Sequence, residues 1–407
     1  MNRPEGAVWI TGVGVATSLG LTFKDLGDSL LAGKSGVSRV DKFDPTEQHC
    51  QVAAGFPDLP SPDGWDAADF VARSDWEQIL LFTAVNALQD SGWWDKRSSA
   101  RIGLVIGNGA EWVQVWERSL HAGGRRIFEP PCDRSDLTTF TREALGLTGP
   151  SATVAAACAS GNVALAQARR WLQRGWVDVC VAGACDRPLS PIGMAGFGNL
   201  GALSKRNNDP EAASRPFDRG RDGFVMGEGG AMFVLERASD ARRRGAKVYG
   251  EVAGVGAASD AFHLVIPSTD TGPCVRSMRL ALADAGIDPA DLDYVNAHAT
   301  STPVGDVFES RALREAFGEA VLTVPVSATK SMTAHLLSAA AAVEAAACLV
   351  AIERHAIPPT INLDDLDPEC ALNHVSGTAR EVRVESAMSN SFGFGGSNIC
   401  VVFKSVA

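Results

Sequence analysis

The sequence lacks cysteine pairs of the kind that build disulfide frameworks or zinc sites. Its nine cysteines are scattered and odd in number, and no two of them are spaced as C-x-x-C. Such usage is typical of free thiols in a reducing compartment. We therefore expect a cytoplasmic protein that holds no metal ion.

Excess positive charge and long apolar runs are missing too. The formal net charge is −11, so nothing predicts a nucleic-acid surface. The apolar run at residues 7–16 is broken by a threonine and two glycines, which favours a strand over a signal peptide. The most apolar segment, residues 336–352, is alanine-rich and contains Glu344. It is typical of a buried core helix, so we expect no membrane span.

Apolar residues, by contrast, are plentiful, at 45% of a 407-residue chain, which is enough for two domain-sized halves. Residues 151–183 predict a strand, a turn, a buried helix and a second strand, and residues 323–358 repeat much of that order. Strands that alternate with helices at this spacing predict a parallel α/β sheet. We expect a duplicated α/β unit, divided into residues 1–250 and 251–407 and packed as one body.

One cysteine stands at a predicted strand-to-helix turn. The apolar run from Ala152 to Ala157 predicts a buried strand, and a helical pattern begins at Gly161. Backbone N–H groups converge at a helix N-terminus, where they stabilise a thiolate and can hold an oxyanion. Cys158 is therefore a candidate nucleophile. The alternative is a small buried side chain without a chemical role, as most free cysteines are.

A histidine follows another predicted strand, at His298, and precedes hydroxyl residues that include Thr300 and Thr302. The histidine could transfer protons, and the hydroxyls could bind an amide-bearing ligand. The alternative is a strand-end histidine bonded to backbone and two ordinary turn residues.

Two further stretches combine a turn with residues that suit a site. Lys330 and His335 bracket a turn into the alanine-rich helix, where a lysine needs a partner and Glu344 is the natural one. A purely structural Lys330–Glu344 ion pair is compatible with this reading. Three glycines surround Phe394 and allow close backbone approach and movement. The phenylalanine could gate a pocket, or it could simply plug a glycine turn.

One cysteine and two histidines on separate strand ends suit thioester chemistry, and a second histidine with a lysine exceeds what hydrolysis needs. From Ile10 to Ile399 the chain resembles the β-ketoacyl-acyl carrier protein synthases, the elongating condensing enzymes of the thiolase fold, and among them the type II synthases. The motifs that carry the resemblance are Ala156-Ala-Cys158-Ala-Ser-Gly161, Arg215-Pro-Phe-Asp218 with Arg221-Asp-Gly-Phe224, Ala297-His298-Ala-Thr-Ser-Thr-Pro303, Thr329-Lys-Ser-Met332 and Gly393-Phe-Gly-Gly396.

This resemblance implies a thiolase-like α/β fold whose duplicated halves stack in five layers, α-β-α-β-α. It also implies the catalytic roles. Cys158 would carry the acyl group, and His298 and His335 would complete a triad that decarboxylates a malonyl unit and stabilises the enolate. Lys330 with Glu344 would organise the site.

Binding roles are implied in the same way. The backbone N–H groups of Cys158 and Phe394 would form the oxyanion hole, and Phe394 would act as the gate. Thr300 and Thr302 would hold a phosphopantetheine arm, with Asp306 as a supporting residue. No resident cofactor is expected, because the substrates would arrive on the phosphopantetheine of an acyl carrier protein.

The implied reaction is a decarboxylative Claisen condensation that gives a 3-oxoacyl-acyl carrier protein in fatty-acid or polyketide/polyene synthesis. The implied partners are the acyl carrier protein and a second subunit, in a homodimer or in a heterodimer with a homologous chain. Two alternatives stay open: a non-catalytic or chain-length-controlling partner subunit, and a thiolase-like acyl hydrolase or transferase.

Several positions depart from the family pattern. Ala299, Ala334 and Ser338 stand where the family carries glycine, and we expect the added groups to crowd the malonyl or pantetheine side. Glu111 and Trp112 stand in what the family builds as a glycine-rich loop near the far end of the acyl tunnel. They are candidate acyl-pocket residues that would favour short, polar or unsaturated chains, unless Trp112 fills the subunit interface instead.

A final departure concerns the carrier protein. The family's helix at this point of the chain is basic and docks the acidic carrier, whereas this chain has Asp75 and Glu77 there. We expect an acidic helix surface, which favours a specialised polyketide or polyene role.

Overall fold

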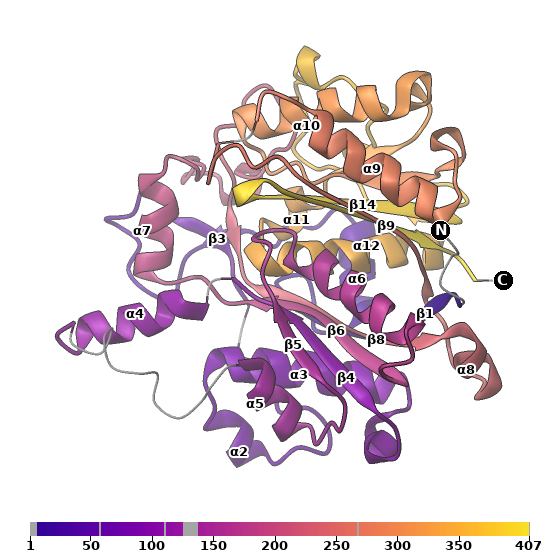
Figure 1. The fold of residues 1–407 in the computed structure, drawn as a ribbon. Helices are drawn as coiled ribbons and strands as arrows, with labels where there is room; N and C mark the ends of the chain where they lie inside the picture. Colours follow the sequence, from indigo (N-terminus) through magenta and orange to yellow (C-terminus); the bar gives the residue numbers. More distant parts are fainter. Residues whose placement is uncertain (1–5, 57, 110, 125–136, 267, 407) are drawn as a thin grey trace.

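The computed structural model describes residues 6–56, 58–109, 111–124, 137–266 and 268–406 (Figure 1). Strands of the first half are β1 (Val8–Thr17), β4 (Ile102–Gly107), β5 (Ser151–Val154), β6 (Val179–Asp186) and β8 (Gly229–Arg237). Those of the second are β9 (Gly250–Ser259), β10 (Tyr294–Asn296), β11 (Val326–Ser327), β14 (Ser386–Gly393) and β15 (Ser397–Lys404). Two small sheets contain β2 (Ser38–Arg39), β3 (Val52–Ala54) and β7 (Met226–Gly227), and β12 (Ala356–Ile357) and β13 (Arg380–Glu381).

Helices connect and cover these strands. They are α1 (Phe23–Leu31), α2 (Ala67–Val71), α3 (Asp75–Asp90), α4 (Glu111–His121), α5 (Leu137–Ala144), α6 (Ser160–Gln173), α7 (Pro191–Asn199), α8 (Ala238–Arg243), α9 (Gly272–Ala285), α10 (Pro303–Phe317), α11 (Lys330–Thr333) and α12 (Ala340–Arg354). Within the described residues, no helix is long and apolar enough to cross a membrane.

The two halves repeat one strand order. From the centre outward the first half runs β1-β8-β6-β4-β5 and the second runs β9-β15-β14-β10-β11. In each half the first two pairings are antiparallel and the last two are parallel. The halves join where Trp9 and Ile10 pair with Glu251 and Gly250. The expected duplication is confirmed, whereas the division at residue 250 stays a prediction.

The sheet is mixed: the outer pairings of each half are parallel, as expected, but the expected parallel sheet was wrong for the inner strands. The connection between β14 and β15 is only the short turn Phe394–Gly396. Parallel neighbours need a crossover of a dozen or more residues, and a turn of this length forces an antiparallel pair.

Figure 1 shows the layers one above another. Helix α3 packs on the first-half strands, α6 and α12 lie between the two sets of strands, and α9 packs on β9 and β15. The five-layer α-β-α-β-α fold is thus confirmed. In the central layer, residues 340–352 of α12 are alanine, valine, leucine, isoleucine or cysteine, apart from a single glutamate, Glu344.

Matching glycines let a helix pack closely on the first strand of each half. A Cβ added at Gly14 of β1 would lie 2.0 Å from the backbone oxygen of Thr83 in α3. One added at Gly256 of β9 would lie 1.9 Å from the backbone oxygen of Ser277 in α9. Both glycines end a Gly-Val-Gly triplet. These triplets therefore serve helix–strand packing in both halves.

Two expected elements differ from the structure. The strand that leads to Cys158 is shorter than predicted, ends at Val154, and is half-exposed because β5 lies at the edge of the sheet. The predicted loop at Glu111 and Trp112 is instead the start of α4. The side chains of these two residues lie outside what the structure describes, so their expected role in the acyl pocket stays a prediction.

Candidate active site

Cys158 lies in a tight turn between β5 and α6. Ala157 adopts a left-handed backbone with φ of 48°. The hydroxyl of Ser160 accepts the N–H of Ala156 at 2.9 Å and donates to the carbonyl of Ala157 at 2.7 Å, which closes the turn. A Cβ at Gly161 would lie 2.5 Å from the backbone nitrogen of Ala342 in α12. Small residues at this crossing thus bring the cysteine turn against the central helix.

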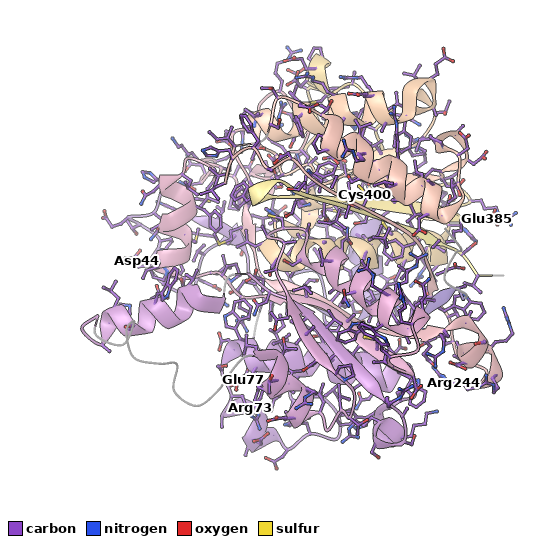
Figure 2. The ribbon with its side chains drawn as sticks, viewed as in Figure 1. Asp44, Arg73, Glu77, Arg244, Glu385 and Cys400 are labelled. Atoms are coloured by element: carbon purple, nitrogen blue, oxygen red, sulfur yellow. The ribbon has the colours of Figure 1, made fainter. Side chains whose placement is uncertain are left out.

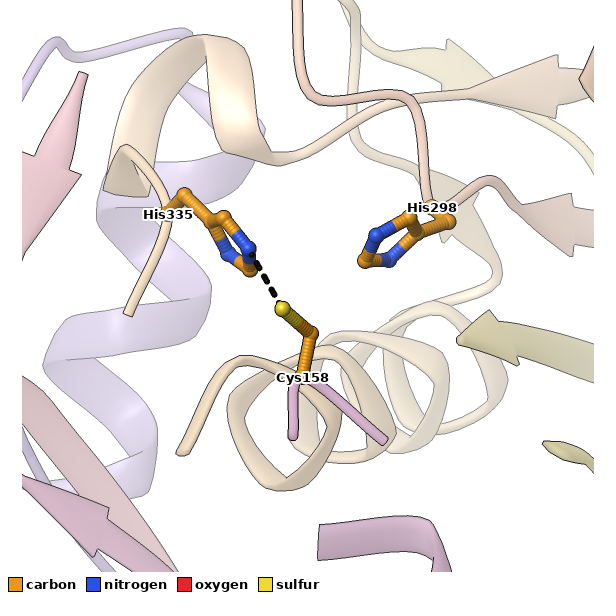
Figure 3. Close-up of side chains that lie close together, drawn as sticks. All are labelled: Cys158, His298 and His335. Atoms are coloured by element: carbon orange, nitrogen blue, oxygen red, sulfur yellow. Dashed lines mark hydrogen bonds between the residues drawn. The ribbon is translucent and has the colours of Figure 1, made fainter. Parts of the chain in front are cut away.

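The turn between α11 and α12 contributes His335, whose ring lies beside the thiol. The expected strand-end position of this histidine was therefore wrong. Its Nε2 is 3.1 Å from Sγ of Cys158, as the dashed line in Figure 3 marks. Backbone bonds fix the residue, because its N–H donates to the carbonyl of Val225 at 2.8 Å and its carbonyl accepts the N–H of Gly227 at 2.9 Å. Among the described residues its Nδ1 has no hydrogen-bond partner. Neither tautomer is therefore fixed, and Nε2 can accept or donate a proton.

The other histidine, His298, faces the same thiol from the opposite side (Figure 3). One nitrogen from each ring and the sulfur of Cys158 all lie within 4.8 Å of one another. Nζ of Lys330 is 3.4 Å from Nδ1 of His298 and pairs with the carboxylate of Glu344. Since an ammonium group only donates, this contact leaves the ring proton on Nε2. His298 thus offers an N–H to the cavity.

Burial controls the charge of the triad. Burial raises the pKa of the Cys158 thiol to about 11, although the charge of Lys330 and a hydrogen bond from the backbone of Phe394 oppose it. Burial and the nearby Lys330 charge hold the pKa values of His298 and His335 well below the usual range. At neutral pH the resting site is therefore a thiol between two neutral imidazoles. Burial thus opposes the thiolate that the helix N-terminus was expected to stabilise, and the nucleophilic role of Cys158 stays a prediction.

A buried carboxylate that the sequence reading missed supports His298. Glu309 accepts the N–H of His298 at 2.9 Å and that of Ala299 at 2.6 Å. The side chain of Asn390 donates to the same carboxylate at 3.2 Å. Burial raises the pKa of Glu309 to about 7, and these bonds oppose the shift. In the sequence, the only sign of Glu309 was its place three residues after Asp306. That spacing alone does not predict that its carboxylate contacts the strand end at His298.

The glycine turn meets the cysteine turn as the oxyanion-hole assignment requires. A Cβ at Gly393 would lie 2.5 Å from the carbonyl oxygen of Ala156 and 3.2 Å from the nitrogen of Cys158, so only glycine fits. The backbone of the next residue, Phe394, reaches the thiol. Its ring is 37% exposed at the cavity, where a gate would stand. The roles in holding the oxyanion and in gating stay predictions.

A cavity of about 600 Å³ opens onto the triad. Its lining includes Cys158, both histidines, Thr300, Thr302 and Phe394. The hydroxyls of Thr300 and Thr302 are 3.1 Å apart, and the Thr302 hydroxyl also accepts the N–H of Gly305 as the N-cap of α10. Asp306 is fully buried behind this wall, where it accepts the N–H groups of Phe217 and Ser301.

The three glycine replacements lie in different surroundings. Ala299 lines the cavity, as expected. Ala334 does not line it, but has a left-handed backbone with φ of 57° and ψ of −168°. Ser338 lines the cavity wall, where its N–H and hydroxyl donate to Asp186 at 3.0 and 2.6 Å. Crowding of the malonyl or pantetheine side is therefore wrong for Ala334, whose methyl group strains the backbone instead.

The expected acidic face of α3 is wrong in part. Glu77 is buried and forms a capping box with Ser74 at the start of the helix. Figure 2 shows Glu77 beside Arg73, near the start of this helix. Asp75 is exposed but lies 3.4 Å from the guanidinium of Arg187. Both carboxylates thus serve helix capping or ion pairing, and the inference of a specialised substrate loses this support.

Three donors from cysteine and histidine could also suit a metal ion. Two features of the described residues oppose that reading. The ammonium of Lys330 lies against His298, where it would repel a cation. The cavity also opens past two threonine hydroxyls, as a site for a long organic ligand would.

Comparison with protein families agrees with this geometry. Residues 5–241 match the N-terminal domain of the β-ketoacyl synthases, and residues 249–364 match their C-terminal domain. The chain belongs to the β-ketoacyl synthase family. It is 38% identical to 3-oxoacyl-[acyl-carrier-protein] synthase 2 of Synechocystis, over 99% of each chain. It is 39% identical to the protein of that name from Vibrio cholerae, over 98% of each.

Solved ketosynthases have the same fold. The ishigamide ketosynthase/chain length factor superposes with a TM-score of 0.89 at 31% identity, over 99% of this chain and all of the other. A type II polyketide ketosynthase, solved bound to a hexaketide with its acyl-carrier protein, has a TM-score of 0.88 at 29% identity with the same coverage. A β-ketoacyl synthase from Burkholderia phymatum is 33% identical, also with a TM-score of 0.88.

Proposed function

We propose that the chain is an elongating condensing enzyme. It transfers an acyl group to Cys158, decarboxylates a malonyl group carried on an acyl carrier protein, and joins the two as a 3-oxoacyl thioester with release of CO₂. The observation that carries this proposal is the thiol held between two imidazoles, one at 3.1 Å and the other fixed as an N–H donor by Lys330.

Loading begins with the thiol. Because burial keeps Cys158 protonated, Nε2 of His335 takes the proton as sulfur attacks the acyl thioester. The backbone N–H groups of Cys158 and Phe394 hold the oxyanion. The pantetheine thiol then leaves with the proton. The acyl group is now part of the protein, so condensation becomes an intramolecular step.

Condensation needs no strong base. The malonyl thioester oxygen accepts a hydrogen bond from Nε2–H of His298 and another from His335 in its second tautomer, which carries the ring proton on Nε2 and not on Nδ1. Loss of CO₂ leaves an enolate that these bonds stabilise. The enolate carbon attacks the acyl carbonyl on Cys158, and the sulfur leaves as the C–C bond forms. The Thr300 and Thr302 hydroxyls hold the amide of the pantetheine arm. Because both acyl groups arrive on such an arm, the protein needs no cofactor of its own.

The partners follow from the chemistry and the sheet. Both substrates ride on an acyl carrier protein, and we place this work in the cytoplasm because the described cysteines are free thiols. Strand β5 ends the first-half sheet and is half-exposed, whereas Val326 of its counterpart β11 bonds to Asn373 and Val375. An open edge favours pairing with a second copy or a homologous subunit.

A non-catalytic subunit would not need this arrangement. The triad, the Lys330–Glu344 pair and the cavity are all present, which favours catalysis. A hydrolase would leave the second histidine and the lysine without a role.

The test uses intact mass in two stages. After incubation with acyl-acyl carrier protein, wild type should gain one acyl group and Cys158→Ala none. After malonyl-acyl carrier protein is added, 3-oxoacyl product should form. His298→Ala should still load but not condense, whereas His335→Ala should load slowly and also fail to condense. An adduct on Cys158→Ala, or full condensation by either histidine variant, would contradict the proposal.

A further inference from the structure

One motif of the sequence has no part in the mechanism above. It covers residues 215–223, that is, the Arg-Pro-Phe-Asp segment and the residues that follow it up to Gly223. It contains none of the three triad residues. We infer that this segment clamps the pantetheine-binding loop, residues 298–302, and that Arg221 is the positioning residue of the clamp. The inference rests on the proposed function of Thr300 and Thr302.

The clamp begins at Ser301, between the two threonines. Ser301 is fully buried and left-handed, with φ of 69°. Its hydroxyl accepts the N–H of Arg215 at 3.0 Å and its carbonyl accepts the N–H of Gly223 at 3.1 Å. Its own N–H donates to Asp306 at 3.1 Å. A non-glycine residue adopts this strained backbone only where its surroundings force it. Because the Ser301 side chain is buried, Thr300 and Thr302 on either side of it lie at the cavity wall.

Arg221 holds the next part of the loop. Its Nε donates to the carbonyl of Thr302 at 3.1 Å, and Nη2 donates to that of Pro303 at 2.9 Å. Its Nη1 donates to the carbonyl of Asp218 and to the carboxylate of Asp367, each at 2.8 Å. The side chain is 4% exposed. One planar fork thus joins the loop to two other segments, and a lysine cannot reproduce that geometry.

The contacts at Thr302 determine where its hydroxyl points. Its carbonyl is held by Arg221, and its hydroxyl oxygen accepts the N–H of Gly305. The hydroxyl proton can then reach only Thr300 or a ligand in the cavity. Loss of the fork would leave the carbonyl with only the longer bond from the N–H of Asp306, at 3.4 Å, and so misplace the hydroxyl. In the part of the chain that the structure describes, the contacts of Arg221 are with residues 218, 302, 303, 306 and 367 and not with Cys158 or either triad histidine, so the thiol chemistry should be spared.

The experiment compares two acyl donors with the whole protein. One donor is an acyl-pantetheine, and the other is an acyl thiophenyl ester, which has no amide for the threonines. Arg221→Lys should raise KM for the acyl-pantetheine about tenfold, as loss of a charged hydrogen bond implies. Its kcat, and its acylation by the thiophenyl ester, should change less than about twofold. Arg219→Gln is the matched control, because Arg219 is 60% exposed and pairs with the exposed Asp365. It should match wild type.

A second comparison separates positioning from general damage. In a Thr302→Val background, Arg221→Lys should raise the KM for the acyl-pantetheine by less than a further factor of about two, because the hydroxyl that Arg221 positions is gone. Three results would overturn the clamp. They are an equal slowing of Arg221→Lys with both donors, a full additional rise in KM in the Thr302→Val background, and an unchanged KM for the acyl-pantetheine. If Arg221→Lys does not fold, Asp367→Asn, which removes one contact of the fork, should give the same KM change in weaker form. Failure of wild type to react with either donor would instead contradict the proposed function.

Discussion

At the scale of single residues, burial decides the state of the nucleophile. The helix N-terminus and Lys330 both favour a thiolate at Cys158, yet removal from water outweighs them and raises the pKa to about 11. His335, 3.1 Å away, is kept neutral by the same burial. The thiol and the imidazole are therefore uncharged before substrate arrives, and in the mechanism we propose the proton moves only as the thioester is attacked.

This predicts how alkylation of Cys158 depends on pH. The thiolate is the reactive form, so its fraction should rise about tenfold per pH unit below the pKa. We expect the rate of Cys158 modification by iodoacetamide, measured by peptide mass, to climb steadily from pH 7 to pH 9. Cys158→Ser supplies the background from the other thiols. A rate that levels off below pH 8 would show a preformed thiolate instead.

At the scale of elements, the turn between α11 and α12 stores strain next to His335. Ala334 has φ of 57° and ψ of −168°, a region that is essentially restricted to glycine. The residue is buried, and its neighbour His335 is fixed by backbone bonds to the segment that contains β7. The chain therefore tolerates this strain because the surrounding hydrogen bonds determine the turn.

Replacement of Ala334 by glycine should stabilise the protein. Relief of strain, less the backbone entropy of glycine, should raise the free energy of unfolding by about 1 kcal/mol. The matched control is Ala299→Gly, another site where the family carries glycine but where φ is not positive. That variant should be neutral or less stable than wild type. Thermal unfolding of both variants checks this, and a lower midpoint for Ala334→Gly would contradict the strain argument.

At the scale of the whole molecule, the repeated strand order ends in one open edge. The β5 edge is half-exposed, while the β11 edge is buried. The carbonyl of Val154 accepts the N–H of Asn108, which continues β4, so the backbone groups of Val154 point toward β4. The backbone N–H and carbonyl of Thr153 therefore point to the open side. A second subunit that pairs there would extend the sheet through both chains.

We expect the protein to be a dimer whose interface includes β5. Thr153→Pro removes the outward N–H and should convert the dimer to monomer in light scattering at micromolar concentration. Thr153→Val, which keeps strand propensity and loses only the hydroxyl, should remain dimeric. A monomeric wild type, or a dimer that survives Thr153→Pro, would place the interface elsewhere or exclude it.

The sequence by itself determined the local elements and the chemistry of the site. Helix α3 begins directly after its capping Ser74 and ends at Asp90, before Ser91 and Gly92, because such local signals act within a few residues. Cys158, His298 and His335 could be selected because their residue types, each next to a predicted turn, limit what they can do.

Tertiary structure alone decided what depends on contacts between distant segments. Glu309 supports His298 only because α10 folds back on its strand end, and Glu77 is a buried cap although its sequence position suggested a surface acid. The pKa of Cys158 followed burial, which no local pattern states. The Arg221 clamp joins segments that are 81 residues apart. Charge, strain and hydrogen bonding at these positions are properties of the packed interior, where water is excluded and each polar group needs a specific partner.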